Sequence, residues 1–196
     1  MIGFHARKSG TIVPIRDCFL VESALLETIP ALEEITRLGA SRAATISLAV
    51  TLTETGVDLL VNGAKPLDGP LRSALPQFRD TFARLTWGDE PVYTNEAPRL
   101  TLGTARVTPS PGAFLQATRD GEAALQQAVS EAVEGAKSIT DLFCGLGTFT
   151  LPLAQSTPVH AVEAVPDLLD ALDHATRHTT GLKPITIEKR DLFRRP

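Results

Sequence analysis

The order of segments in the second half of the chain predicts an α/β fold with a parallel sheet of the doubly wound type. Strands are expected over 138–143, 159–165 and 185–188, and helical segments lie between them. An apolar run followed at once by two glycines marks the first strand-to-helix turn. Because parallel strands need a crossover connection, strict alternation of strands and helices favours this fold class.

The composition is that of a globular protein. The 196 residues are 43% hydrophobic and 21% charged, with a net charge of −4, which excludes a fibrous, collagen-like or largely disordered chain. A chain of this length can bury about 70% of the surface of its unfolded form. It lacks the basic excess that often accompanies nucleic-acid binding, so net charge alone does not indicate an RNA partner.

Cysteine usage and the N-terminal residues suggest the compartment. Two cysteines, Cys18 and Cys144, are too few for a disulfide framework or a four-cysteine metal site. Reduced thiols are typical of the cytoplasm. The N-terminal residues lack the apolar segment of a secretory signal, and no run approaches the roughly 18 apolar residues of a membrane span. We therefore expect a cytoplasmic protein that does not bind a membrane.

The first half of the chain is expected to form a separate α+β domain over residues 1–107. Two short strands are expected within 2–20. The clearest hairpin is expected within 44–62, where apolar and small polar residues alternate and Gly56 ends the turn. Strand–strand–helix groups in tandem would then form an α+β layer.

Helices of this first domain are predicted from apolar spacing. Residues three or four apart form apolar faces over 22–38 and 68–85, and Pro30 is expected to kink or split the first helix. A Pro-Ser-Pro break places the domain boundary near 107–111, so that the second domain covers 108–196.

The turn after the first strand of the second domain carries the most informative motif. An apolar strand runs into Gly145 and Gly147, and a helix follows. Glycine is needed where the backbone turns tightly and approaches a ligand closely. A dinucleotide fingerprint would need a third glycine where Thr150 stands, and a P-loop would need Gly-Lys-Ser/Thr. The loop therefore suits a nucleoside ligand without a pyrophosphate.

Acidic residues follow the next two strands. Glu163 ends the second strand, where a carboxylate can accept hydrogen bonds from both ribose hydroxyls, and Asp191 follows the third, where a side chain can reach the adenine edge. Because the carboxyl ends of parallel strands meet at one crevice, these residues together suggest S-adenosylmethionine (SAM). A solvated strand-end carboxylate is the simpler alternative at each position.

The segment 114–192 resembles the RNA uracil-5-methyltransferase family, whose members make 5-methyluridine in tRNA and ribosomal RNA. The resemblance rests on Gly-Ala-Phe-Leu-Gln at 112–116, on Asp-Leu-Phe-Cys-Gly-Leu-Gly-Thr-Phe at 141–149 and on Val-Glu at 162–163. Segment 3–18 also resembles the central domain of these enzymes. The implied fold is the first half of a Rossmann-like class I SAM methyltransferase domain, preceded by an α+β central domain that contacts RNA.

The resemblance also implies roles for particular residues. Besides the backbone of Gly145 and Gly147, the implied SAM contacts come from Gln116, Phe143, Thr148, Glu163 and Asp191. Phe114 would lie against the target uracil, although a core position is the ordinary interpretation of such a residue. The family often has Asn where Thr148 stands, so this contact differs here.

The two cysteines have different implied roles. Cys18 matches the last ligand of the iron–sulfur cluster in the ribosomal-RNA members, so such a cluster is implied only for a complete enzyme. This match favours ribosomal RNA over tRNA as the partner, while a structural cysteine is the alternative from the residues alone. Cys144 lies in the cofactor loop, where a buried packing thiol is a simpler interpretation than a nucleophile.

The family reaction needs groups that this chain lacks. A cysteine thiolate adds to carbon 6 of uracil, and a carboxylate later removes the proton from carbon 5. In the family these groups follow later strands, and this chain has neither an Asp-Pro-Pro segment nor a third cysteine. We therefore expect an inactive fragment, without a catalytic residue, of an enzyme that methylates carbon 5 of uridine in RNA.

Two alternatives remain open at this point. One is a SAM-dependent methyltransferase that acts on another base or on a small molecule. The other is a non-catalytic RNA-binding module.

Overall fold

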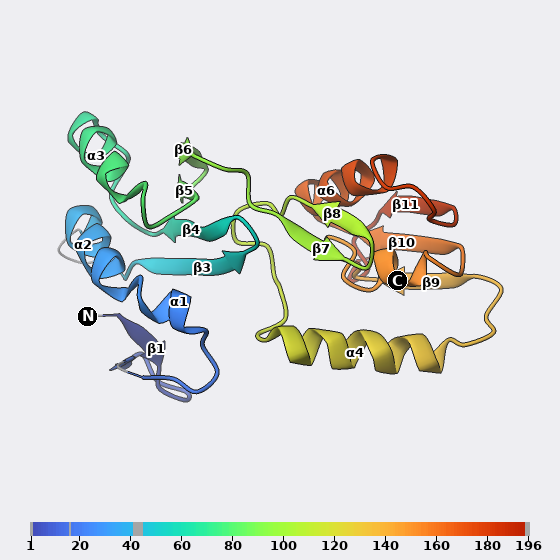
Figure 1. Ribbon diagram of the computed structural model, residues 1–196. Coiled ribbons are helices and arrows are strands. Elements are labelled where there is room, and N and C mark those ends of the chain that lie inside the picture. Colours follow the sequence, from blue (N-terminus) through green and yellow to red (C-terminus); the bar gives the residue numbers. More distant parts are fainter. Residues whose placement is uncertain (1, 16, 41–44, 195–196) are drawn as a thin grey trace. The chain divides into compact units, whose positions relative to one another are not determined.

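The computed structural model describes residues 2–15, 17–40 and 45–194. The chain divides into two compact units, Met1–Pro98 and Arg99–Pro196. Figure 1 colours the elements of both units in chain order, from blue to red.

A four-stranded sheet forms the centre of the first unit. Its order is β3-β4-β5-β6, and its strands cover Ser47–Thr53, Gly56–Asn62, Arg84–Trp87 and Glu90–Thr94. β3 and β4 form the predicted antiparallel hairpin, and Gly56 has the positive φ of 124° that its turn requires. β4 and β5 run parallel, so the chain between them crosses over through a helix.

That crossover helix is shorter than the one expected over 68–85. α3 covers Gly69–Ala74, a 3₁₀ turn covers Leu75–Phe78, and Leu85 lies on β5. Pro76 has no N–H for the helical ladder, and its ring opposes continuation of an α-helix. Apolar residues continue at helical spacing beyond Pro76, but they lie on a loop (Phe82) and on β5 (Leu85), where they are buried without forming a helix.

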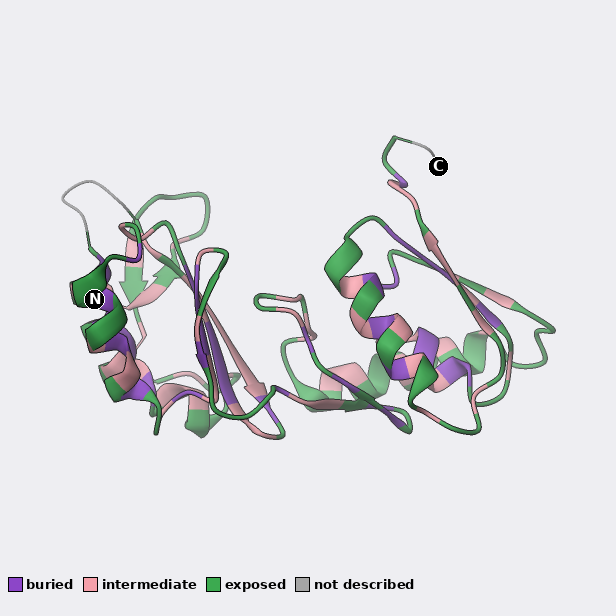
Figure 2. Cartoon of the chain, turned by 90° about the horizontal axis from the view of Figure 1, so that it is seen from above, coloured by how far each residue is buried: buried purple, intermediate pink, exposed green. Residues whose placement is uncertain are grey.

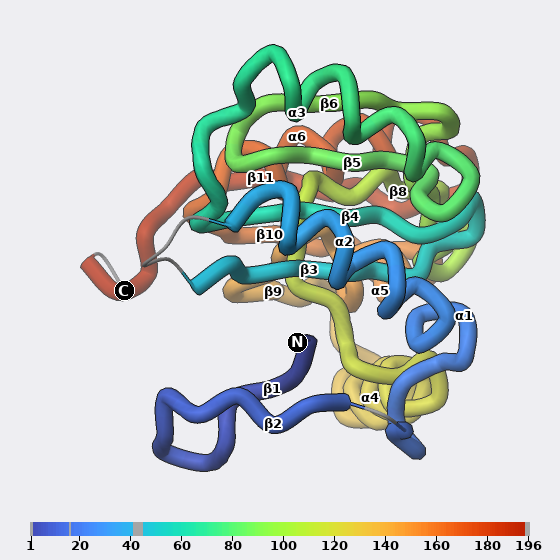
Figure 3. The backbone as a smooth tube through the Cα atoms, turned by 90° about the vertical axis from the view of Figure 1, so that its left-hand side faces the viewer, coloured from blue at the N-terminus to red at the C-terminus, as the bar shows by residue number. Residues whose placement is uncertain are grey.

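The helix expected over 22–38 is divided, as Pro30 suggested. α1 covers Ser23–Leu26 and α2 covers Ile29–Gly39. Figure 3 shows α2 and α3 on the same side of the four-stranded sheet. Their buried side chains and those of β4 and β5 form one apolar core, and Figure 2 shows this buried layer in purple.

The two strands expected within 2–20 are confirmed, but they stand apart from this sheet. β1 (Gly3–His5) and β2 (Ile12–Pro14) pair only with each other among the described strands. The expected tandem of two strand–strand–helix groups therefore does not form one layer. The four-stranded sheet is completed instead by β5 and β6, which follow the crossover helix.

Three parallel strands form the larger sheet of the second unit, in the order β11-β10-β9. They cover Ile139–Leu142 (β9), Val159–Glu163 (β10) and Ile185–Lys189 (β11). The alternation predicted from the sequence is confirmed. The helices of this unit are α4 (Arg119–Ala132), α5 (Thr150–Leu153) and α6 (Pro166–Arg177).

A short hairpin begins the second unit. β7 (Leu100–Leu102) and β8 (Ala105–Val107) pair antiparallel. Their buried residues share a core with Leu172 of α6. The sequence prediction placed this hairpin in the domain 1–107. Because its apolar face is buried against α6, the compact units divide after Pro98 instead.

Over the described parts of the chain, every helix is too short or too polar to cross a bilayer.

Candidate functional site

Parallel pairing brings the glycine loop beside Glu163. Val162 of β10 lies opposite Leu142 of β9. Beyond β9, the Cys144 N–H donates a 3.1 Å hydrogen bond to the Val162 carbonyl. The loop therefore leaves β9 at the sheet edge where β10 ends in Glu163, as the sequence predicted for a crevice at the carboxyl ends of parallel strands.

The two glycines of the loop have different surroundings. Both have positive φ, 58° at Gly145 and 93° at Gly147. A Cβ atom at Gly147 would lie 2.6 Å from Leu172 Cδ1 and 3.1 Å from Leu151 Cγ. A Cβ atom at Gly145 would meet nothing within 4 Å. Gly147 therefore permits close packing against α6, whereas Gly145 borders the open space that a ligand can occupy.

Backbone N–H groups hold the Glu163 carboxylate in place. Oε2 accepts a 3.1 Å hydrogen bond from Gly145 N–H, and Oε1 accepts bonds of 2.7 and 3.1 Å from Ala164 and Val165. The residue is only 8% exposed. A carboxylate oxygen can accept two hydrogen bonds, and Gly145 is the one donor to Oε2 among the described residues. That oxygen therefore retains an acceptor direction for a hydroxyl group.

Cys144 is a packing residue in this loop. Its side chain is buried and belongs to the core shared with α6. Burial and, to a lesser degree, the nearby carboxylates of Asp141 and Glu163 together raise the pKa of its thiol to about 12. The thiol is therefore protonated at neutral pH, which agrees with the prediction of a packing thiol rather than a nucleophile.

Asp141 and Thr150 form a contact that the sequence analysis missed. The Thr150 hydroxyl donates a 2.6 Å hydrogen bond to Asp141 Oδ2, and Thr150 is fully buried. Burial raises the pKa of the Asp141 carboxyl, while the hydrogen bonds from Thr150 lower it. The pair joins the end of β9 to the start of α5. The sequence did hold a signal for this contact. Asp141 stands at the end of a predicted strand, and Thr150 stands where a dinucleotide fingerprint would have its third glycine.

Aromatic rings border the opening of the loop. Phe143 has a φ of 60°, uncommon for an aromatic residue, and is 54% exposed. Its ring lies 5.3 Å from that of Phe193, tilted by 49°. Phe193 follows β11, and sequence reasoning did not single it out. This contact places the segment after β11 beside the glycine loop.

Asp191 shapes the segment that carries Phe193. Its Oδ1 atom accepts hydrogen bonds of 3.0 Å from Phe193 N–H and 3.3 Å from Arg194 N–H. Its carboxylate is thus engaged by its own turn. The structure places Asp191 near the predicted crevice through the contact between Phe193 and Phe143, and it assigns a turn-forming role that the sequence analysis did not foresee.

The segment before α4 carries the remaining candidates. Ala113 and Leu115 pack against the core of the second unit. Phe114, between them, is 79% exposed, so it is not a core residue, and Gln116 is half-buried. Alternation along residues 113–116 thus leaves the Phe114 ring available for a partner.

Thr148 lies in the glycine loop, and its backbone joins this loop to α4. The backbone carbonyl of Thr148 accepts a 3.0 Å hydrogen bond from Gln126 Nε2 of α4.

Cys18 lies in the first unit as a half-buried free thiol. Within the described ranges, no group of three or more His, Cys, Asp or Glu side chains could hold a metal ion. A single thiol does not make an iron–sulfur site, so the residues described here do not fit such a cluster by themselves. The role of Cys18 as one of its ligands stays a prediction.

Curated relatives align with the whole chain, although no family model matches it. An uncharacterised RNA methyltransferase of Brucella suis is 38% identical over 198 residues, and one of Rhizobium meliloti is 39% identical over 198 residues. Each match covers 100% of this chain and 48% of the relative. A 23S rRNA (uracil-C5)-methyltransferase of Shewanella piezotolerans is 28% identical, covering 86% of this chain and 41% of that protein. The chain thus spans about half the length of the curated relatives it matches.

Solved methyltransferase structures share the fold. The tRNA (uracil-54, C5)-methyltransferase of Pyrococcus abyssi, in complex with S-adenosyl-L-homocysteine, matches with a TM-score of 0.67 at 19% identity, over 95% of this chain and 52% of that chain. Methanocaldococcus jannaschii Trm5 in complex with adenosine matches with a TM-score of 0.52 at 13% identity, over 90% and 54%. The predicted methyltransferase fold and the predicted relationship to RNA methyltransferases are confirmed.

Proposed function

We propose that this chain, which matches RNA methyltransferases over its whole length, belongs to an enzyme that transfers a methyl group from SAM to carbon 5 of a uridine in RNA. Its first unit contributes to RNA binding, and its second unit holds SAM. The observation that carries the proposal is the Glu163 carboxylate, fixed by three backbone N–H groups beside the open face of Gly145.

The residues at this sheet edge fit SAM. Gly145 leaves room for close approach of a ligand to the backbone. Glu163 Oε2 can accept a hydrogen bond from a ribose hydroxyl, and the exposed rings of Phe143 and Phe193 offer apolar surface for a flat base. When bound, SAM supplies an electrophilic methyl group. In this proposal these residues bind and orient SAM, and none of them takes up or releases a proton.

The methyl acceptor is proposed from three observations. The relative from Shewanella is named as a uracil C5 methyltransferase of 23S ribosomal RNA, and the fold neighbour from Pyrococcus is named for a uracil in tRNA. The exposed Phe114 ring supports stacking on an unpaired base. Because the Cys144 side chain is buried in the core and the pKa of its thiol is raised to about 12, another residue supplies the nucleophile for carbon 6 in this proposal.

Ribosomal RNA is the proposed substrate in preference to tRNA. The support is the match of Cys18 to a cluster ligand of the ribosomal-RNA members and the name of the Shewanella relative. A cytoplasmic location is also proposed. It is supported by the two free thiols, because reduced cysteines are typical of that compartment.

Calorimetric titration of the chain with SAM tests this proposal. Replacing Glu163 by Gln keeps an amide oxygen for the N–H donors but removes the charge, and we expect about tenfold weaker binding, or about 1.4 kcal/mol. The exposed Glu134, replaced by Gln, is the matched control and should bind SAM as the native chain does. Equal affinity of both variants would remove Glu163 from the site.

A further inference from the structure

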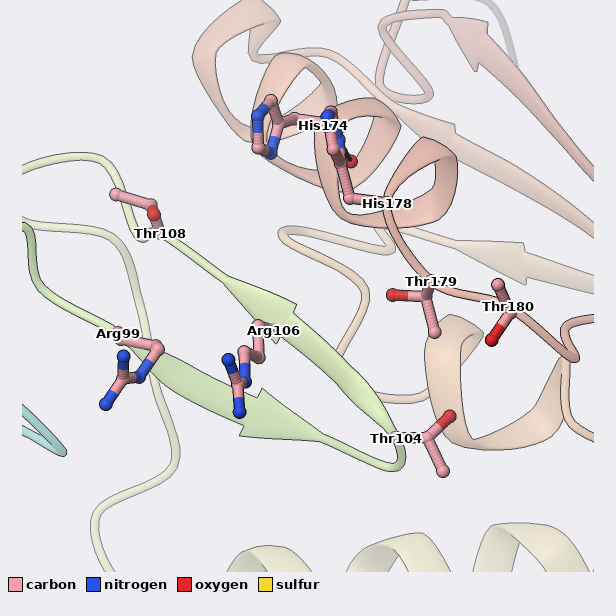
Figure 4. A pocket seen from close by; sticks show the side chains of 8 residues that line it. All are labelled: Arg99, Thr104, Arg106, Thr108, His174, His178, Thr179 and Thr180. Carbon is pink, nitrogen blue, oxygen red and sulfur yellow. Dashed lines mark hydrogen bonds between the residues drawn. The ribbon is translucent and has the colours of Figure 1, made fainter.

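A cationic groove of about 730 Å³ lies in the second unit, beside the C-terminal end of α6. Its walls are the β7–β8 hairpin and the C-terminal end of α6 with the residues that follow (Figure 4). α6 begins three residues after Glu163, and its 12 residues span about 18 Å. The groove is therefore separate from the crevice at the carboxyl ends of the strands.

Strand alternation builds one wall. Ala105 and Val107 face the core, while Thr104, Arg106 and Thr108 are exposed, because successive side chains of a strand point to opposite faces. All three exposed side chains line the groove. The buried side chains anchor the hairpin to α6, so the wall is held by packing beneath it.

The end of α6 builds the other wall. His174 and His178, one helical turn apart, stack with ring centroids 4.1 Å apart. A carbonyl oxygen only accepts, so His178 Nδ1 donates the 2.7 Å hydrogen bond to the His174 carbonyl. The Thr179 hydroxyl donates to the Ala175 carbonyl at 2.8 Å. These bonds cover carbonyl groups at the helix end that would otherwise repel an anion.

The lining is rich in donors and free of carboxylates. Among the described residues that line the groove there are two arginines, two histidines and four threonines, and none is acidic. The acidic residues near this end of α6 are Asp173, which pairs with Arg177 at 2.8 Å, and Asp170, one turn before His174. Neither of them lines the groove. In a chain of net charge −4, this local excess of cations favours an anionic ligand.

We propose that this groove binds the phosphodiester backbone of an RNA strand, and this proposal rests on the proposed function. Guanidinium and hydroxyl groups are the usual phosphate partners in nucleic-acid complexes. Six of the eight lining residues are exposed, so the groove is an open channel, which suits an extended polyanion better than an enclosed small molecule. The groove lies beside the C-terminal part of α6, whereas Glu163 precedes the N-terminal end of that helix, so the contact positions the RNA and does not select a base.

Fluorescence anisotropy of the full 196-residue chain with a labelled uridine-rich RNA tests the groove. Arg106→Gln should weaken binding roughly three- to tenfold and should reduce the slope of log affinity against log salt by about 0.7. Arg106→Lys should retain most of the affinity, because the charge remains. The exposed Arg119, at the start of α4 and outside the groove, provides the control Arg119→Gln.

Two further arms complete the test. Arg106→Gln combined with His178→Gln should weaken RNA binding more than either change alone, and inorganic phosphate should compete poorly with RNA for the native chain. All groove variants should bind SAM with native affinity, because the groove is separate from the SAM site. Failure of the native chain itself to bind SAM would count against the proposed function and not against the groove. Unchanged RNA affinity and salt slope in the double variant, or inorganic phosphate competing as well as RNA does, would overturn the groove as an RNA site.

Discussion

The Thr150 hydroxyl donates a 2.6 Å hydrogen bond to Asp141 Oδ2, across the turn that carries the glycine loop. Thr150 is fully buried, and Asp141 is sufficiently enclosed for burial to raise the pKa of its carboxyl. The bond spans nine residues and ties the end of β9 to the first residue of α5. It therefore holds both ends of the loop that borders Glu163.

Replacing Thr150 by Val should destabilise the second unit by about 1–3 kcal/mol. The isosteric change removes the donor and leaves the Asp141 carboxylate without that partner in a buried position. Thermal unfolding measures the effect, and Thr101→Val on the exposed face of β7 is the control. A loss no larger than that of the control would show that the pair contributes little.

Asp141 should also make stability depend on pH. The folded carboxyl has a pKa raised above 3.8, so the folded state binds more protons than the unfolded state between 3.8 and the raised value. Stability relative to Asp141→Asn should then fall as pH rises through that window, and remain constant above it. Urea unfolding of both proteins at several pH values measures this difference. A difference that is the same at every pH would contradict the burial of a titrating carboxyl.

Alanine at the two loop glycines should separate packing from binding. Gly147→Ala should cost about 1–3 kcal/mol, because its Cβ would meet Leu172 at 2.6 Å and its φ is 93°. Gly145→Ala should cost less stability, since its Cβ would meet open space, but it should weaken SAM binding. Unfolding and calorimetry together measure both changes. SAM affinity unaffected by Gly145→Ala would place the ligand elsewhere.

Thiol labelling should distinguish the two cysteines. At neutral pH a thiol reagent should label Cys18 faster than Cys144, because Cys144 is buried and its pKa is raised to about 12. Denaturant should make both react. Mass spectrometry of the labelled peptides gives the rates, and rapid labelling of Cys144 in the folded chain would contradict its packing role.

The exposed edge at β9 should promote self-association. Among the described strands β9 pairs only with β10, and Leu142 and Phe143 near its end are 50% and 54% exposed. Unpaired apolar edges are templates for pairing with another chain. Light scattering should show association that grows with protein concentration, and Leu142→Lys should reduce it. A monodisperse monomer with strong amide protection along β9 would refute this prediction.

Local patterns were sufficient for most elements and for part of the site. Alternating apolar residues predicted the β3–β4 hairpin, and strand–helix alternation predicted the parallel sheet. The glycine motif and Glu163 were identified because the turn chemistry of such a loop is encoded within a few consecutive residues. Helix length was overestimated where Pro76 interrupted an apolar spacing that continued beyond it, because periodicity alone does not register a missing N–H.

Local sequence patterns did not predict the contacts between segments that are distant in the chain. The sequence by itself determined the order of the elements, the loop glycines and the acidic residue after β10, since these depend on local conformational preference and spacing. Only the tertiary structure decided that the β7–β8 hairpin packs on α6, that Thr150 binds Asp141, that Phe193 meets Phe143, and that Arg106 and His178 share a groove. Each of these depends on which faces are buried together, and burial is a property of the packed chain rather than of any one segment.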